Sequence, residues 1–319
     1  RLDIVATSWG RNTPWHASAE RPYELYVGQF GTPAVGLLFA RRDSVSGKDM
    51  PLEPYERLVN AAPGVREQFR TFTDYSRATV EDVLGAVRAT AVRLGATTFD
   101  HTVFLNRGDR FDSVPLPALA QLAPAFGIVV ADFDGNGTED LFLAQNFSGT
   151  AVETQRFDAG AGLVLLGDGK GGFTPSSVTA SGISVLGDMR GAAAADFDGD
   201  GRVDLAVSQN SARTTLWKNV GGAPGISVRL IGDTGNPLAI GAHLAAVRQG
   251  TRRAVRELHA GAGYWSMDAA TTVLSASPGD SVWVRWPGGR EQTVPIPAGA
   301  RTVTVRAVGV AAAGPTSSR

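Results

Sequence analysis

Cysteine is absent from the 319 residues of this chain. Its absence excludes disulfides, zinc sites built on thiolates and cysteine nucleophiles. It does not decide the compartment, because a bound ion can replace disulfides as the constraint that stabilises a secreted domain.

Charged residues are also scarce, at 19%, and the formal net charge is −1. A chain so close to neutrality has no electrostatic preference for nucleic acid or an anionic membrane surface. No apolar run reaches about 18 residues, so no transmembrane segment is predicted. The sequence starts at Arg1 and shows no signal-peptide pattern, which we interpret as a processed or excised piece.

Apolar residues and glycine are plentiful by contrast. Hydrophobic residues make up 43% of the chain, which is enough for a sizeable core and predicts two domains. The 39 glycines suit many tight turns between short strands.

A repeat is the strongest signal in the sequence. Residues 127–146 read GIVVADFDGNGTEDLFLAQN, and residues 191–210 read GAAAADFDGDGRVDLAVSQN. Each unit joins an apolar strand, an acidic turn and a second apolar strand. Repeated units of this kind predict propeller blades or a β-solenoid.

Two weaker copies precede these units. Residues 26–40 keep the strand–loop–strand outline but place Gln29, Gly31 and Pro33 where carboxylates would stand, so we expect no metal there.

The start of the chain, RLDIVATSWG, matches the second half of the later unit, with Asp3 in the place of Asp204. This match predicts that the acidic front half of the first loop, and further blades, lie upstream of Arg1.

Hairpins are expected between the loops. Residues 104–111 (FLNRGDRF) and 165–173 (LLGDGKGGF) place glycine and aspartate between apolar stretches, and 214–219 (TTLWKN) reads as a third strand. We therefore interpret the Arg-Gly-Asp triplet and the GxGxxG pattern inside these segments as turns. A dinucleotide site would need a helix after the glycines.

Residues 51–98 change to helical spacing and predict two or three helices inserted in a blade. Val80, Val83, Leu84, Val87, Val92 and Leu94 are expected to form one apolar face. Thr79 with Asp82 marks a helix start. The insert is either a partner surface or a helical cap over a sheet edge.

The acidic turns have the composition of metal loops. In DFDGDGRVD, side chains at positions 1, 3, 5 and 9 and the carbonyl at position 7 supply oxygen ligands, which suits Ca²⁺ better than Mg²⁺. The predicted ligands are Asp196, Asp198, Asp200, the carbonyl of Arg202 and Asp204 in one loop, and Asp132, Asp134, Asn136, the carbonyl of Thr138 and Asp140 in the other.

The alternative is a pair of acidic β-turns without metal, in which the carboxylates would repel one another at neutral pH. An EF-hand is excluded, because position 12 is Leu143 or Val207 instead of glutamate. Asn136 replaces a carboxylate in the first loop, so we expect that site to be the weaker one. Phe133 and Phe197 are expected to pack inward between blades.

These loops and hairpins resemble FG-GAP/VCBS repeats, the blades of integrin-like β-propellers. Residues 226–308 resemble the ASPIC/UnbV domain through GNPLAIGAHL (235–244), REL-HAGAGYWSMD (256–268) and VWVRWPGGREQTV (282–294). The resemblance implies a secreted or envelope-associated protein with calcium at the two loops and no settled enzymatic activity. One departure is TTVLSAS (271–277), which stands where members have a His-Phe-Gly-Leu-Gly-like stretch.

The expected fold is mainly β. Residues 1–224 form an incomplete propeller segment, 225–308 a small β-sandwich or barrel with alternating strands, and 309–319 a disordered tail. On the loop 261–266, Tyr264 and Trp265 either stack on a sugar ring or pack against the propeller.

The predicted function is a binding or interaction module of an extracellular, periplasmic or envelope protein, with structural calcium and an unknown protein or glycan partner. Four scattered histidines and the lack of a catalytic motif argue against an enzyme. The alternative is a carbohydrate-active hydrolase or lyase with its site on a propeller face.

Overall fold

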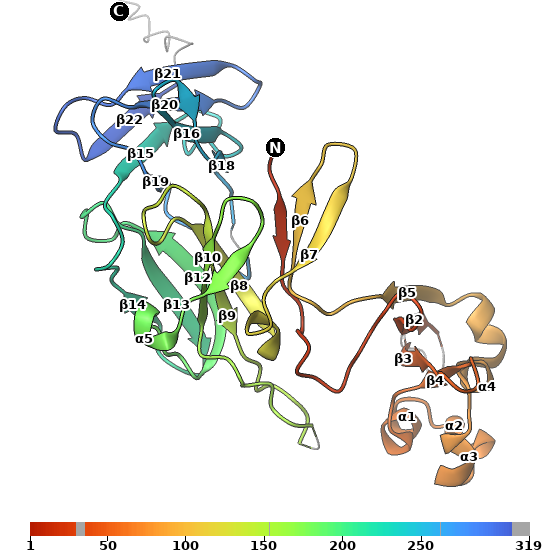
Figure 1. Cartoon of the computed structure of the whole chain (residues 1–319). Coiled ribbons are helices and arrows are strands. Elements are labelled where there is room, and N and C mark those ends of the chain that lie inside the picture. The colour runs from red at the N-terminus through yellow and green to blue at the C-terminus, as the bar shows by residue number, and fades with distance from the viewer. Residues whose placement is uncertain (30–35, 153, 262, 308–319) are drawn as a thin grey trace, which may run out of the picture. The chain divides into compact units, whose positions relative to one another are not determined.

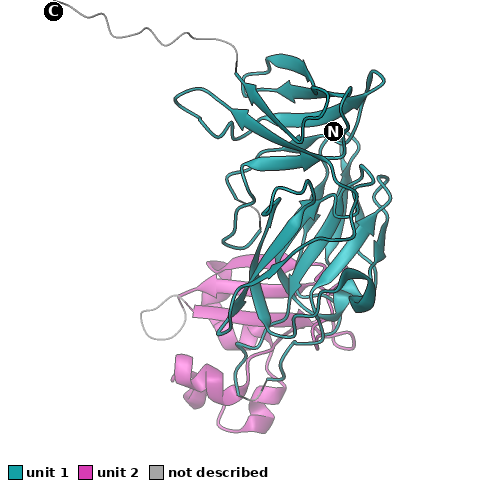
Figure 2. Ribbon diagram, turned by 90° about the vertical axis from the view of Figure 1, so that its left-hand side faces the viewer, with its two compact units in different colours: residues 1–12, 100–319 teal, residues 13–99 magenta. Residues whose placement is uncertain are grey.

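The computed structural model describes residues 1–29, 36–152, 154–261 and 263–307. The chain divides into two compact units, residues 13–99 and the remainder (Figures 1 and 2). The predicted Gly31 and Pro33 positions and the predicted tail, 309–319, lie outside the described residues.

Strands dominate the larger unit, and three of its sheets are antiparallel blades. The first has the order β1-β6-β7, the second β11-β10-β9-β8 and the third β12-β13-β14. No closed ring of blades forms within the described ranges, so the fold is a partial β-propeller. The strands of the blades are β1 (Ile4–Ala6), β6 (Thr102–Asn106), β7 (Phe111–Pro115), β8 (Ala125–Ala131), β9 (Asp140–Gln145), β10 (Leu163–Gly167), β11 (Phe173–Pro175), β12 (Asp188–Ala195), β13 (Asp204–Asn210) and β14 (Thr215–Trp217).

The blades pack face to face through apolar side chains. Val103 and Leu105 of the first blade share a cluster with Leu141, Leu143 and Leu165 of the second. A second cluster joins strands β8 and β9 to β12 and β13. Two short helices, η2 (Ala120–Leu122) and α5 (Val178–Ser181), lie in the connections. The hairpins predicted at 104–111 and 165–173 and the third strand predicted at 214–219 are confirmed.

The unit 13–99 is inserted between the second and third strands of a blade, β1 and β6. The chain leaves and re-enters the first blade beside Arg11, whose guanidinium donates two hydrogen bonds, of 2.8 and 2.6 Å, to the carboxylate of Asp100. In the second and third blades the same connection is an ordinary loop, between β9 and β10 and between β13 and β14.

The inserted unit has a sheet of its own, with the order β4-β3-β2-β5. Helices cover one face of this sheet, where Tyr26, Leu38 and Ala40 pack on the helical residues Leu58 and Leu84. The elements are β2 (Tyr23–Gly28), β3 (Gly36–Arg42), β4 (Asp49–Pro51), α1 (Tyr55–Ala61), α2 (Val65–Gln68), α3 (Phe72–Ser76), α4 (Val80–Leu84), the 3-10 helix η1 (Gly85–Ala89) and β5 (Val92–Ala96).

The helical stretch is shorter than predicted. It ends at Ala89, and Val92 and Leu94 lie on strand β5, where both side chains are exposed. The prediction that these two residues continue the apolar helical face is wrong, because residues 92–96 pair with β2 instead. The helix start predicted at Thr79 is confirmed by a capping box with Asp82.

Strands within residues 226–261 and 263–307 form two sheets around a common apolar cluster, which makes a β-sandwich. One sheet has the order β19-β15-β22, and the other has the order β17-β16-β20-β21 with β18 paired to β16. The strands are β15 (Ile226–Ile231), β16 (His243–Arg248), β17 (Thr251–Arg252), β18 (Arg256–Glu257), β19 (Thr271–Leu274), β20 (Ser281–Arg285), β21 (Glu291–Pro295) and β22 (Thr302–Arg306). No helix in the described part of the chain is long and apolar enough to cross a membrane.

Candidate metal centres

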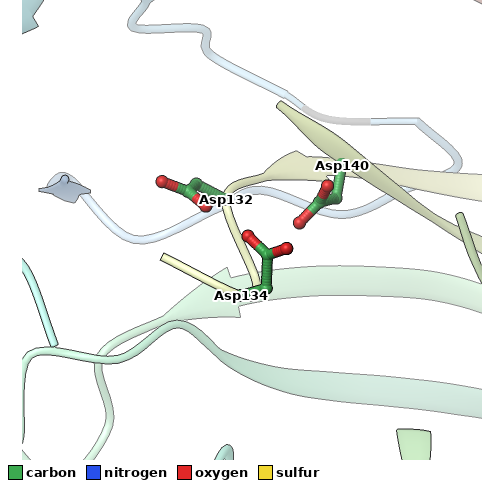
Figure 3. A group of neighbouring side chains, drawn as sticks. All are labelled: Asp132, Asp134 and Asp140. Atoms are coloured by element: carbon green, nitrogen blue, oxygen red, sulfur yellow. The ribbon is translucent and has the colours of Figure 1, made fainter. Parts of the chain in front are cut away.

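Both acidic loops occupy the turn between the first two strands of a blade. Three carboxylates in each loop can bring one oxygen apiece within 4.8 Å of one another: Asp132, Asp134 and Asp140 in the second blade, and Asp196, Asp198 and Asp204 in the third. Figure 3 shows the first group, with Asp134 between Asp132 and Asp140.

The last aspartate of each loop ties the loop to its blade. Asp140 accepts hydrogen bonds from the backbone N–H of Phe133 and of Gly167, each at 2.8 Å. Asp204 accepts the equivalent bonds from Phe197 at 2.9 Å and Asn219 at 2.8 Å. Both carboxylates therefore have one fixed orientation.

Asp3 repeats this pattern in the first blade. Its carboxylate accepts a hydrogen bond of 2.7 Å from the backbone N–H of Asn106, at the end of the third strand. The structure thus gives Asp3 the same place as Asp140 and Asp204, in agreement with the sequence match.

The first aspartate of each loop is held by backbone N–H groups. Asp132 accepts from Asn136 at 3.0 Å and from Gly137 at 2.8 Å, and Asp196 accepts from Gly201 at 3.1 Å. Gly137 and Gly201 both adopt a positive φ, 93° and 86°, which few other residues tolerate.

Burial makes these carboxylates electrostatically costly. It raises the pKa of Asp132 to about 6 and also raises the pKa of Asp140. Asp196 Oδ1 is buried and has no hydrogen-bond partner in the described part of the chain. A cation among these oxygens would satisfy the orphaned atom and favour the ionised form, so the donor set fits a hard metal ion.

The remaining predicted ligands have other partners. Asn136 Oδ1 accepts from the backbone N–H of Thr138 at 2.7 Å. Asp200 lies outside the converging group and accepts a hydrogen bond of 3.2 Å from Arg202 Nη1. The carbonyls of Thr138 and Arg202 stay predicted ligands.

Lys218 contacts the loop 196–204, and the sequence analysis did not predict this contact. Its ammonium forms an ion pair with Asp198 and lies 3.6 Å from Asp200 Oδ2. The hydrogen bond from Lys218 lowers the pKa of Asp198.

Phe133 is partly buried against the apolar cluster between the second and third blades, whereas the side chain of Phe197 is 71% exposed. The expectation of an inward-facing Phe197 is therefore wrong. The third blade is the last one in the described chain, and no fourth blade covers its outer face within the described residues.

Both loops also contact the segment that leads into the sandwich and the sandwich itself. Ser227 on β15 donates a hydrogen bond of 2.6 Å to Asp196 Oδ2, and Ser275 donates one of 3.1 Å to the carbonyl of Gly135. Within the first loop, Glu139 accepts a hydrogen bond of 2.6 Å from Arg256 on β18. The loops thus stand at the junction between blades and sandwich.

A cleft of about 690 Å³ lies beside this junction. Apolar side chains such as Ile4, Val130 and Met267 line much of it. Its ionisable groups contact other groups: Glu139 with Arg256, Glu257 with two histidines, and Asp268 with the backbone N–H of Ala194.

Tyr264 and Trp265 of the sandwich differ in their contacts, and each fits one of the two predicted roles. Tyr264 packs edge-on against Phe126 of β8, with ring centroids 5.8 Å apart. Trp265 stacks on Tyr264 and is 94% exposed.

Three repeated antiparallel blades, two of them with an acidic turn, are followed by a sandwich and define a β-propeller-type repeat protein with an appended β domain. Comparison with protein families identifies both parts: residues 152–207 match the FG-GAP-like repeat, and residues 232–311 match ASPIC and UnbV. The predicted family resemblance is confirmed. The loop 132–140 lies outside the matched range. A search of curated proteins found no match.

Proposed function

We propose that each acidic loop binds one Ca²⁺ and that the ion stabilises the blade and its junction with the sandwich. The observation that carries this proposal is the convergence of three carboxylates in two loops with the same backbone scaffold. The ligands would be Asp132, Asp134, Asn136, Thr138 (carbonyl) and Asp140 in one loop, and Asp196, Asp198, Asp200, Arg202 (carbonyl) and Asp204 in the other.

The contacts to the sandwich extend the effect of the ion beyond the loop. Ser227 donates a hydrogen bond to Asp196 of the loop 196–204, and Ser275 donates one to Gly135 of the loop 132–140. Without a cation, repulsion among the carboxylates would spread each loop and weaken these contacts.

Calorimetric titration with calcium tests the proposal. Two sites per chain are expected, with dissociation constants of ~10⁻⁴–10⁻³ M, as is usual for extracellular calcium modules. Limited proteolysis in EDTA and in calcium adds a structural readout, because cleavage between Asn219 and Ile226 should be faster in EDTA. A titration without binding heat, together with equal cleavage rates, would contradict the proposal.

We further propose that the chain is an interaction module of a secreted or envelope-associated protein, with a protein or glycan as partner. The FG-GAP-like repeat and the ASPIC and UnbV match support this class of function. Trp265 offers an exposed ring for stacking, which supports a binding role.

A glycan array tests the glycan branch of this proposal. Binding that Trp265→Ala abolishes, while Trp15→Ala in the inserted unit leaves it intact, would support stacking on this loop. Binding that survives both substitutions would refute a role for Trp265.

A further inference from the structure

The second and third blades differ in the residue that comes just before the one bonded to the last aspartate of the acidic loop. The hydrogen bonds to Asp140 and Asp204 come from Gly167 and Asn219, which makes these two residues equivalent. Strand pairing agrees, since Leu141 lies opposite Leu165 and Leu205 opposite Trp217. Leu166, which precedes Gly167 in the second blade, is therefore equivalent to Lys218, which precedes Asn219 in the third.

Lys218 makes the second loop less negative than its sequence indicates. The loop 196–204 has four aspartates, but Arg202 pairs with Asp200 and Lys218 pairs with Asp198, which leaves two uncompensated charges. The loop 132–140 has three aspartates and Glu139; Arg256 pairs with Glu139 and the apolar Leu166 adds no second cation, which leaves three uncompensated charges.

The ammonium group contacts a carboxylate that calcium would need. Asp198 belongs to the converging group of three, so an ion that binds its carboxylate competes with the ammonium of Lys218 for the same negative charge. The lysine side chain is 55% exposed, which leaves it free to turn into solvent. Its charge nevertheless stays tethered close to the loop.

We propose that Lys218 is a built-in competitor of calcium, so that the loop 196–204 binds the ion more weakly than the loop 132–140. This inference rests on the proposed calcium function. It reverses the order expected from the number of carboxylates alone. It also implies that repulsion spreads the empty loop 196–204 less than the empty loop 132–140, because the ammonium takes part of the cation's role.

Calorimetric titration of single-loop chains tests the inference. Asp134→Ala leaves only the loop 196–204 able to bind, and Asp198→Ala leaves only the loop 132–140. Loss of the exposed ion pair and of the repulsion from a tethered positive charge predicts that Lys218→Leu tightens calcium binding about fivefold in the Asp134→Ala chain. Lys218→Gln should act in the same direction, which separates loss of charge from the gain of an apolar side chain.

Lys170→Leu is the matched control, since Lys170 lies in the β10–β11 hairpin and forms no ion pair with either loop among the described residues. It should leave the affinity unchanged. Calcium binding that Lys218→Leu and Lys218→Gln alter by less than about twofold would refute the competitor while the proposed function stands. If the unsubstituted chain gives no calcium heat, both fail.

Discussion

Asp134→Ala should separate calcium binding from local packing in the loop 132–140. In the structure Asp134 accepts hydrogen bonds from the backbone N–H and side-chain amide of Asn136, at 3.0 and 2.9 Å, on the same loop. Loss of these near-surface bonds should lower the free energy of unfolding by only about 1 kcal/mol in EDTA.

Calcium should make the same substitution much more costly. An ion at a hundred times its dissociation constant stabilises the folded state by ~2.7 kcal/mol per site. For a domain of this size each kcal/mol raises the melting temperature by ~2–4 °C, so one occupied loop contributes ~5–10 °C. Asp134→Ala should remove the contribution of one loop and retain that of the other.

A melt followed by tryptophan fluorescence measures this difference in the compact unit that contains the loops. Of the six tryptophans, only Trp15 lies in the inserted unit, so the signal reports mainly on the blades and sandwich. The matched control is Asp109→Ala, because Asp109 is an exposed aspartate in the turn between β6 and β7. If Asp134→Ala keeps the full calcium shift, or if EDTA leaves the unsubstituted chain unmoved, the assignment of this loop is refuted.

Three further outcomes are expected. Burial lowers the pKa of His101, whose folded form is neutral. Its contribution to stability is therefore present above the unfolded pKa of about 6.5 and is lost as the pH falls. His101→Gln should flatten the acid limb of a curve of stability against pH, and an unchanged limb would contradict this. Gly135→Ala should destabilise more than Gly199→Ala, since both have a positive φ but only the first would clash with a neighbouring carbonyl; equal melting temperatures would contradict the clash. Arg93→Met removes the ion partner of Glu24, whose buried carboxylate keeps the hydrogen bond of 2.9 Å from the Tyr26 hydroxyl, so the substitution should cost about 1.5–3 kcal/mol in a denaturant titration followed by circular dichroism. A cost below about 0.5 kcal/mol would mean that the pair is replaceable.

Features set by neighbouring residues could be predicted from the sequence. The glycine and aspartate spacing of the acidic turns, the hairpins at 104–111 and 165–173, and the capping box at Thr79 each depend on contacts within a few positions. The place of Asp3 could be predicted as well, because a repeated sequence repeats its hydrogen bonds.

Features set by distant partners could not be predicted in this way. Val92 and Leu94 continue a helical spacing, but pairing with β2 makes them part of a strand. Lys218 reaches Asp198 only through the register of β13 and β14, which local pattern does not contain. Phe197 lies on the outer side of the third blade, and its sequence context is nearly the same as that of Phe133.

The ion pair between Arg11 and Asp100 has a consequence for how this chain could be taken apart. The pair links the two points between which residues 13–99 are inserted. This link keeps the geometry of the first blade where the chain leaves and re-enters it. The third blade bridges the same gap between β13 and β14 with a short loop. A short linker should therefore be able to replace the whole inserted unit. The same position should also accept other folded domains as insertions.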